Sequence, residues 1–339
     1  MNVYFSPDQR LHAPTHEVFG GEMITPFETP DRIDQVLARM ETIGPVLAPR
    51  DFGLGPLKRI HDPAYVDFLS GCWDEWTAAG FRGEAIATVM PSHRTGRRCP
   101  THIEGKIGYF AFSGESAIMK DTFQAARASA NAALSAADAV STGERAAFAL
   151  CRPPGHHCMT AQFGGYCYLN NAAIAAQYLR DLGADRVAVL DIDFHHGNGT
   201  QDIFYERADV LFCSLHGDPD RAYPFYLGCA DETGAGPGEG CNRNYPLPPG
   251  TGFGQWAAAL GDASRHIETF APDVLVVSLG VDLYERDPQS FFAIASDDFT
   301  EIGRRIGDLG LSTVFVMEGG YAVADLGVNV EKVLTGFGC

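Results

Sequence analysis

The chain has 339 residues, of which 45% are hydrophobic and 20% charged, and this balance excludes a disordered protein. Its formal net charge of −18 disfavours nucleic acid and anionic membranes as partners and would attract a small cation, although many acidic proteins carry such charge for solubility alone. The apolar run VLVVSLGV has only eight residues, far below the roughly 20 that span a bilayer.

The first residues and the cysteines both indicate the cytoplasm. Asp8 and Arg10 precede any apolar stretch of the length that a signal peptide needs. The nine cysteines are an odd number and form no C-x-x-C pair, which is typical of reduced thiols rather than of a disulfide framework. We therefore expect a cytoplasmic protein.

Short β-branched runs alternate along the chain with longer segments of helical period. Strands that are apolar on both faces and separated by helices predict a parallel β-sheet flanked by helices on both faces. Because the sequence contains neither a linker nor an internal repeat, we expect a single α/β domain over residues 1–339. The expected strands are 2–5, 146–150, 186–192, 209–215, 273–280 and 312–318, and the expected helices are 31–44, 64–80, 170–183, 254–270 and 296–310.

Residues 80–112 show no clear period and contain many turn-forming residues. We expect a long loop here. Loops of such length that are not disordered are usually functional.

Five of the expected strands run directly into polar, glycine-rich sequence, namely CRPPGHH, DIDFHHGNG, SLHGD, GVD and EGGY. In open parallel sheets, ligands bind at the carboxyl ends of the strands. The five strand ends therefore predict an active site at one edge of the sheet.

A metal site is expected within this group. Asp193 and His195 are two residues apart, so in an extended chain both side chains point the same way. Asp282, at the end of another apolar strand, is the best-placed third ligand. Two carboxylates and one imidazole suit Zn²⁺ with an open position for water, and Fe²⁺ or Mn²⁺ would accept the same ligands. The alternative is that Asp193 and His195 only cap the following turn.

The adjacent His156 and His157 indicate a device for proton transfer, with Asp191 as the carboxylate that orients one of the rings. Tyr321 follows two glycines at the end of the last strand, where a phenol opposite a metal can hydrogen-bond a developing oxyanion. Gly165 and Tyr166 in FGGYCYLNN either line a narrow cleft or form a simple turn.

The segments RPPGHH, FGGYCYLNNAA, DIDFHHGNGTQDIFY, SLH, SLGVD and EGGY, in this order, resemble the zinc-dependent histone deacetylase superfamily, which has an arginase-like α/β fold. The segments GGEMITPFE, GEAIAT, PTHIEGKIGYF and FYERADVLFCSLHGDP further resemble the bacterial acetylpolyamine amidohydrolases. The similarity covers nearly the whole chain, and its motifs are highly specific.

The resemblance implies a role for each residue of this site. Asp193, His195 and Asp282 would bind Zn²⁺, His157 would be the general base and then the acid, His156 its electrostatic neighbour, and Tyr321 would polarise the amide carbonyl. Asp191 would orient His156, and Asn198 stands where some deacetylases have Asp, so that His157 has a neutral partner. A structural K⁺ would be bound through Asp191, Asp193, His195, Ser214 and Leu215.

The resemblance also implies the substrate site and the assembly. Glu104 and Glu115 match acidic positions near the entrance, and Gly165, Tyr166 and Tyr223 match the walls of a tunnel. The loop at about 80–112 would form the contacts of a homodimer and the tunnel rim. His102 departs from the Asp that relatives can have, and Cys158 and Gln162 alter the loop after GHH.

The predicted reaction is hydrolysis of the acetyl amide of acetylated polyamines, such as acetylputrescine, acetylcadaverine or acetylspermidine, to acetate and free amine. An acetyl-lysine deacetylase of proteins is the main alternative, and a catalytically silent metal-binding protein of the same fold is a second. An arginase-like hydrolase with two manganese ions is disfavoured, since its second ion needs further carboxylates.

Overall fold

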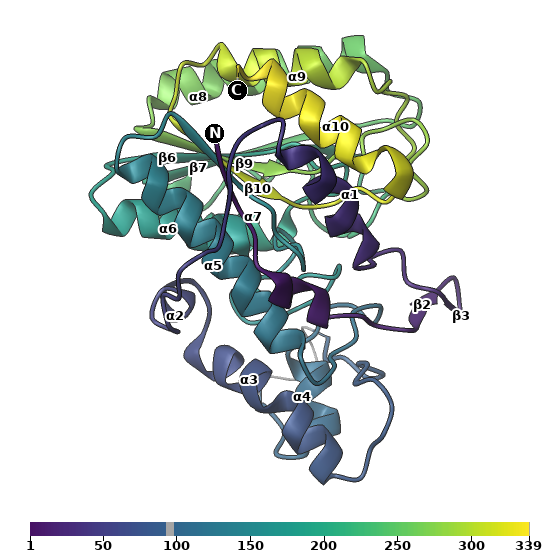
Figure 1. The fold of residues 1–339 in the computed structure, drawn as a ribbon. Coiled ribbons are helices and arrows are strands. Elements are labelled where there is room, and N and C mark those ends of the chain that lie inside the picture. Colours follow the sequence, from purple (N-terminus) through teal and green to yellow (C-terminus); the bar gives the residue numbers. More distant parts are fainter. Residues whose placement is uncertain (93–97, 339) are drawn as a thin grey trace.

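The computed structural model describes residues 1–92 and 98–338. Its centre is an eight-stranded sheet in which all neighbouring strands are parallel, in the order β4-β1-β5-β10-β9-β6-β7-β8 (Figure 1). Strands β6, β9 and β10 are buried along their whole length, as expected for apolar strands covered on both faces. The strands are β1 (Asn2–Tyr4), β4 (Val46–Leu47), β5 (Ala146–Ala149), β6 (Val187–Asp191), β7 (Val210–Gly217), β8 (Asn242–Leu247), β9 (Val274–Leu279) and β10 (Thr313–Met317).

Helices cover both faces of this sheet, as the sequence predicts (Figure 1). Helices α5 (Thr122–Ser141) and α6 (Asn171–Asp181) lie on one face and pack against each other. Helix α7 (Asn198–Phe204) packs against β7. The other face carries α1 (Asp31–Met40), α8 (Phe253–Phe270), α9 (Asp298–Gly307) and α10 (Val323–Gly336). The expectation of a single α/β domain with a parallel sheet is therefore confirmed.

Helix α5 is not among the elements expected from the sequence. Its twenty residues are mostly alanine and serine, and fourteen of them are buried. A helix that is buried on nearly all sides has no polar face, so it lacks the apolar stripe by which periodicity is recognised. The edge strands β4 and β8 were also not expected, because one has two residues and the other mixes polar and apolar side chains.

The expectation of an unstructured loop over 80–112 is wrong in part. The segment contains helix α4 (Ile103–Tyr109), which begins after His102, whose Nδ1 accepts the Glu104 N–H at 3.4 Å. Helix α4 packs against α3 (Pro63–Ala78), and together with α2 (Leu57–Ile60) they form a lobe beside the sheet (Figure 1). Residues 93–97 of the expected loop lie outside the described residues.

An antiparallel hairpin of β2 (Glu17–Phe19) and β3 (Glu22–Ile24) projects from the body of the molecule (Figure 1). Gly20 and Gly21 connect its strands with φ angles of 59° and 85°, a region that glycine adopts readily. Short 3₁₀ helices, η1 (Pro7–Leu11) and η2 (Gly236–Gly238), complete the described elements.

Within residues 1–92 and 98–338, no helix is both long enough and apolar enough to cross a membrane. The cysteines of this part of the chain are all free thiols.

The contact between α9 and α10 depends on a glycine. A Cβ on Gly303 would lie 1.9 Å from the carbonyl oxygen of Val333. We expect Gly303→Ala to lower the free energy of unfolding by about 1–3 kcal/mol, because the helices would have to move apart. Gly261→Ala in α8 is a matched control, since its nearest atom would be 3.9 Å away; it should gain about 0.5–1 kcal/mol from helix propensity. Urea unfolding midpoints measure both, and equal effects would contradict the packing argument.

Buried His61 should make stability depend on pH. Asn170 N donates to Nε2 at 3.0 Å and Nδ1 lies 3.0 Å from the Met159 carbonyl oxygen, so the ring is held neutral. Burial lowers the pKa of His61 to about 4, against 6.5 ordinarily. The unfolded chain therefore takes up this proton first, and stability should fall by up to about 3 kcal/mol between pH 6.5 and 4.

The measurement is the urea midpoint of wild type and His61→Gln at several pH values in this window. His61→Gln should reduce the slope of stability against pH by the part that His61 contributes, whereas His16→Gln, at an exposed imidazole, should keep the wild-type slope. A wild-type slope in His61→Gln would show that other groups are responsible.

Candidate active site

The three expected ligands of the divalent metal lie together, where the carboxyl ends of the strands meet. Asp193 and His195 follow β6, Asp282 follows β9, and these two strands are paired. One ligand atom of each residue lies within 4.8 Å of the others, and all three side chains are buried. The alternative in which Asp193 and His195 only cap a turn does not account for the converging Asp282.

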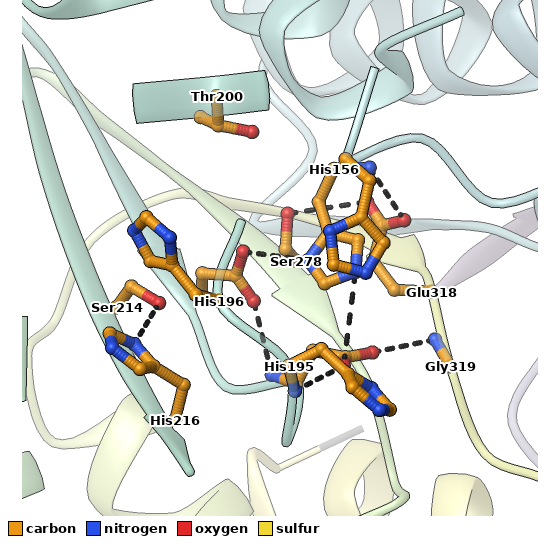
Figure 2. A network of polar contacts seen from close by, with 12 residues as sticks. His156, His195, His196, Thr200, Ser214, His216, Ser278, Glu318 and Gly319 are labelled. Atoms are coloured by element: carbon orange, nitrogen blue, oxygen red, sulfur yellow. Dashed lines mark hydrogen bonds and ion pairs between the residues drawn. The ribbon is translucent and has the colours of Figure 1, made fainter. Parts of the chain in front are cut away.

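Backbone N–H groups fix the two carboxylates. Asp193 Oδ1 accepts from His195 N at 2.8 Å, and its Oδ2 accepts from Gly319 N at 2.7 Å, a contact drawn in Figure 2. Asp282 Oδ1 accepts from Phe194 N at 2.8 Å. The second oxygen of Asp282 therefore remains free to point at His195 Nδ1, 3.1 Å away.

Two glycines make room for these carboxylates. A Cβ on Gly280 would lie 2.1 Å from Asp193 Oδ2, and one on Gly319 would lie 2.4 Å from Asp282 Oδ2. No side chain fits at such distances. The lack of space for a side chain thus explains why glycine stands at these positions of SLGVD and EGGY.

The charges of the cluster fit a divalent cation. Burial, and then the charge of Asp193, raise the pKa of Asp282 to about 8. Burial alone would lower the pKa of His195, but its contacts with Asp193 and Asp282 raise it to about 9, so a proton on Nδ1 partly balances the carboxylates. A cation bound to the same atoms would balance them more fully, and buried carboxylates and an imidazole are the donors that Zn²⁺, Fe²⁺ and Mn²⁺ accept.

The histidine pair stands beside this cluster, with its ring centroids 4.0 Å apart. His156 Nδ1 lies 3.0 Å from Asp191 Oδ2, and His157 Nδ1 lies 2.7 Å from Asn198 Oδ1. Burial opposes a charge on His156, yet the carboxylates of Asp193 and Asp191 raise its pKa to about 10. Burial, and then the charge of His156, lower the pKa of His157 well below its ordinary value. One ring is therefore cationic and its neighbour is neutral.

Glu318 supports the pair from behind. Its Oε2 accepts from Gly155 N at 2.7 Å and from His156 N at 3.1 Å, and Oε1 accepts from Ser278 Oγ at 3.3 Å. Ser278 and Glu318 lie beside His156 in Figure 2. The sequence analysis assigned no role to Glu318, although it directly precedes the glycines of EGGY.

A cavity of about 510 Å³ leads to these groups. His157, His195 and Tyr321 contribute to its lining. The ring of Tyr166 meets that of Tyr321 edge to face at 5.8 Å, and Tyr223 does the same with His157 at 5.0 Å. Gly165 lies so close to His157 that a Cβ would be 2.3 Å from the ring. The remaining lining residues are Glu17, Val18, Phe19, Gly20, Glu115, Phe194, Arg221, Ala222, Phe225, Pro288, Gln289, Ser290 and Phe291.

Two carboxylates are part of the cavity wall. Glu115 Oε1 accepts from Ser113 Oγ at 2.5 Å, Gly165 N at 2.7 Å and Tyr223 Oη at 3.2 Å. The hydrogen bonds described for Glu115 all use Oε1, so Oε2 can accept from a ligand. Glu17 Oε1 accepts from Tyr166 Oη at 2.7 Å. Nothing in the sequence around Glu17 signals this position, because the hairpin brings it there.

Not all expected site residues meet at the cavity. Glu104 is exposed in the first turn of α4 and does not line the cavity of this single chain. For the expected K⁺, Ser214 is paired in register with Asp191, but Ser214 Oγ lies 2.8 Å from His216 Nδ1. Figure 2 shows His196 and His216 at the left, with Ser214, and His156 at the upper right. Within the described residues, no second group of three metal-binding side chains occurs.

The family model for the histone deacetylase domain matches residues 26–337. The chain belongs to the histone deacetylase family. Within this family it is 53% identical to acetylpolyamine amidohydrolase 1 of Pseudomonas aeruginosa, over 99% of this chain and 98% of the relative. It is 51% identical to acetylpolyamine amidohydrolase of Mycoplana ramosa, over 99% of both chains.

Two solved structures have the same fold. A crystal structure of acetylpolyamine aminohydrolase from Burkholderia pseudomallei superimposes with a TM-score of 0.96 at 44% identity, covering 100% of this chain and 99% of that one. The HDA15 HD domain superimposes with a TM-score of 0.80 at 28% identity, over 99% of this chain and 88% of that one.

The metal site is tested by metal content. We expect the purified deacetylase-family protein to retain about one divalent ion per chain, and Asp282→Ala to lower its metal affinity by at least about tenfold, because one of three protein ligands is lost. Elemental analysis after chelator titration measures this. Asp262→Asn, at a partly exposed carboxylate of α8, is the control and should behave as wild type. Unchanged affinity in Asp282→Ala would remove this residue from the site.

Proposed function

We propose that the protein hydrolyses the acetyl amide of small acetylated polyamines to acetate and the free amine. The observation that carries this proposal is a cavity that ends at His157, His195 and Tyr321 and whose wall contains the carboxylates of Glu115 and Glu17. The high identity to proteins named acetylpolyamine amidohydrolases, over nearly the whole chain, supports it.

A metal ion would be held by Asp193, His195 and Asp282. Zn²⁺ is the ion we propose, with Fe²⁺ or Mn²⁺ as alternatives for the same donors. When bound, such an ion polarises a carbonyl oxygen and lowers the pKa of water towards about 7. A structural K⁺ at Asp191, Asp193, His195, Ser214 and Leu215 is a separate proposal, supported so far by the family resemblance.

The proton transfers are assigned to the histidine pair. Because its pKa is depressed, His157 is neutral and can accept the proton of the attacking water. The same proton then passes to the leaving nitrogen as the carbon–nitrogen bond breaks, so that His157 ends neutral. His156, held cationic by Asp191 and Asp193, favours the negative charge that develops on the carbonyl oxygen.

Tyr321 would donate a hydrogen bond to that oxygen. Burial raises the pKa of its phenol well above the ordinary value, so the hydroxyl keeps its proton at neutral pH. A donor placed before the reaction starts stabilises the oxyanion without reorganisation.

The cationic chain of the substrate would lie between Tyr166 and Tyr223, whose faces suit methylene groups and ammonium ions. Glu115 Oε2 would accept from an ammonium group, and the protein's charge of −18 would favour the approach of a cation. We further propose a homodimer through the 80–112 segment, in which Glu104 of α4 would approach an entrance. Cytoplasmic location stays a prediction.

The test is steady-state kinetics of the Zn²⁺-loaded protein on acetylputrescine, acetylcadaverine, acetylspermidine and an acetyl-lysine peptide. We expect the free amines to have the larger kcat/KM by orders of magnitude, and Tyr321→Phe and His157→Ala to keep only a small but measurable fraction of the activity. If the peptide is preferred, the protein is a protein deacetylase. Turnover of none of these substrates would favour a silent metal-binding protein.

The role of Glu115 is tested with a matched pair of substrates. Glu115→Gln should lower kcat/KM for acetylputrescine about 10- to 100-fold, which corresponds to the loss of one hydrogen bond to a charged group. N-acetylbutylamine, which lacks the ammonium group, should be affected far less. Equal losses on both substrates would mean that Glu115 only shapes the wall through Tyr223 and Gly165.

A further inference from the structure

The segment that carries Tyr321 is fixed by contacts at four successive residues, 319 to 322. Gly319 N donates to the metal-site carboxylate of Asp193 at 2.7 Å. Gly320 O accepts from Arg32 Nε at 2.7 Å. Tyr321 N and Ala322 N donate to the same oxygen, Oδ2 of Asp287, at 2.6 and 3.0 Å. Since Gly319 and Gly320 have no side chains to pack, these contacts fix the backbone from which the side chain of Tyr321 extends.

Asp287 is a buried carboxylate with no catalytic assignment so far. Its exposed fraction is 5%, and it stands five positions after the metal-site residue Asp282. Its other oxygen, Oδ1, accepts from Gln289 N at 3.0 Å. Among the described residues it forms no ion pair, and the neighbouring Arg286 is paired with Asp325 instead. The carboxylate of Asp287 thus accepts hydrogen bonds from backbone N–H groups only.

These bonds join two walls of the cavity. Oδ2 holds Tyr321, and Oδ1 holds the turn into Gln289, so both oxygens are needed. Ala322 is also the residue before α10, whose own side chains provide no cap. A negative charge at this end is favoured by the helix dipole, and the carboxylate of Asp287 adds to that of Asp325 in the first turn of α10.

We propose that Asp287 is a positioning residue for the hydrolysis, which acts by fixing the backbone of Tyr321 and thereby the place of its hydroxyl group. This inference rests on the proposed function for its kinetic consequence. Asparagine has the same shape but only one acceptor oxygen, so Asp287→Asn must lose either the bonds to Tyr321 and Ala322 or the bond to Gln289. In either case the two walls are no longer held together.

The experiment is a double-mutant cycle between Asp287→Asn and Tyr321→Phe. We expect Asp287→Asn to lower kcat on acetylputrescine about 10- to 100-fold with a smaller change in KM, since small misplacements of a catalytic group have effects of this size. In the Tyr321→Phe background the same change should lower kcat by less than about threefold. Equal losses in both backgrounds would overturn the proposal.

Asp273→Asn is a matched control at the amino end of β9, away from the strand ends that form the site. Oδ2 of Asp273 also accepts two consecutive backbone N–H groups, from Asp185 at 2.6 Å and Arg186 at 2.9 Å. The Asp273→Asn variant should have the kcat of wild type, and the effect of Tyr321→Phe on kcat should be the same with and without Asp273→Asn. If Asp287→Asn does not fold, Asp287→Glu, which keeps the charge but moves the carboxylate by one methylene, enters the same cycle with the same expectation.

Hydrogen exchange supplies a readout that needs no turnover. Amides of residues 319–326 should exchange faster in Asp287→Asn than in wild type, while the rest of α10 keeps its protection, and Asp273→Asn should show no change there. A wild type that hydrolyses no acetylated amine would overturn the proposed function, and the exchange data would still decide whether Asp287 fixes Tyr321. Unchanged exchange at 319–326 would overturn the inference even in an active enzyme.

Discussion

The structure depends on placing two carboxylates, Asp193 and Asp282, side by side in the protein interior. Two buried like charges repel each other strongly and lose their hydration, so neither stays ionised without nearby compensation. The protein provides part of this compensation with backbone N–H groups, with His195 between the two carboxylates and with the cationic His156 beyond, and the pKa of Asp282 is still raised to about 8. A divalent cation would complete this balance.

This requirement explains the local sequence around the site. The ends of β6, β9 and β10 meet at one edge, so each strand can deliver a polar group to the same point. Gly280 and Gly319 provide the space in which the carboxylates approach the neighbouring strand ends. The histidine pair comes from the end of β5, which adjoins β10. Four strands that are distant in sequence therefore together position the residues of the site.

The metal-site residues at the centre of this arrangement can be predicted from the sequence, because each of them closely follows an apolar run. The period of two places Asp193 and His195 on one side, and the strand pattern adds Asp282. The residues around this centre cannot be predicted in the same way. Glu17 belongs to a hairpin whose position depends on the tertiary fold, and Asp287 lies in a loop, where no periodicity exists. Helix α5 is not predicted, because a helix that is buried on nearly all sides has no amphipathic pattern.

The link between Glu17 and Tyr166 has a consequence for how such a protein can change over evolutionary time. The hairpin reaches the rest of the cavity wall through a side-chain hydrogen bond at its base, while its exposed Val18, Phe19 and Met23 pack little against the core. Mutations, insertions and deletions beyond Glu17 can therefore accumulate without disturbing the sheet or the buried charges. The rim of the cavity can diversify while the chemistry at its floor stays the same.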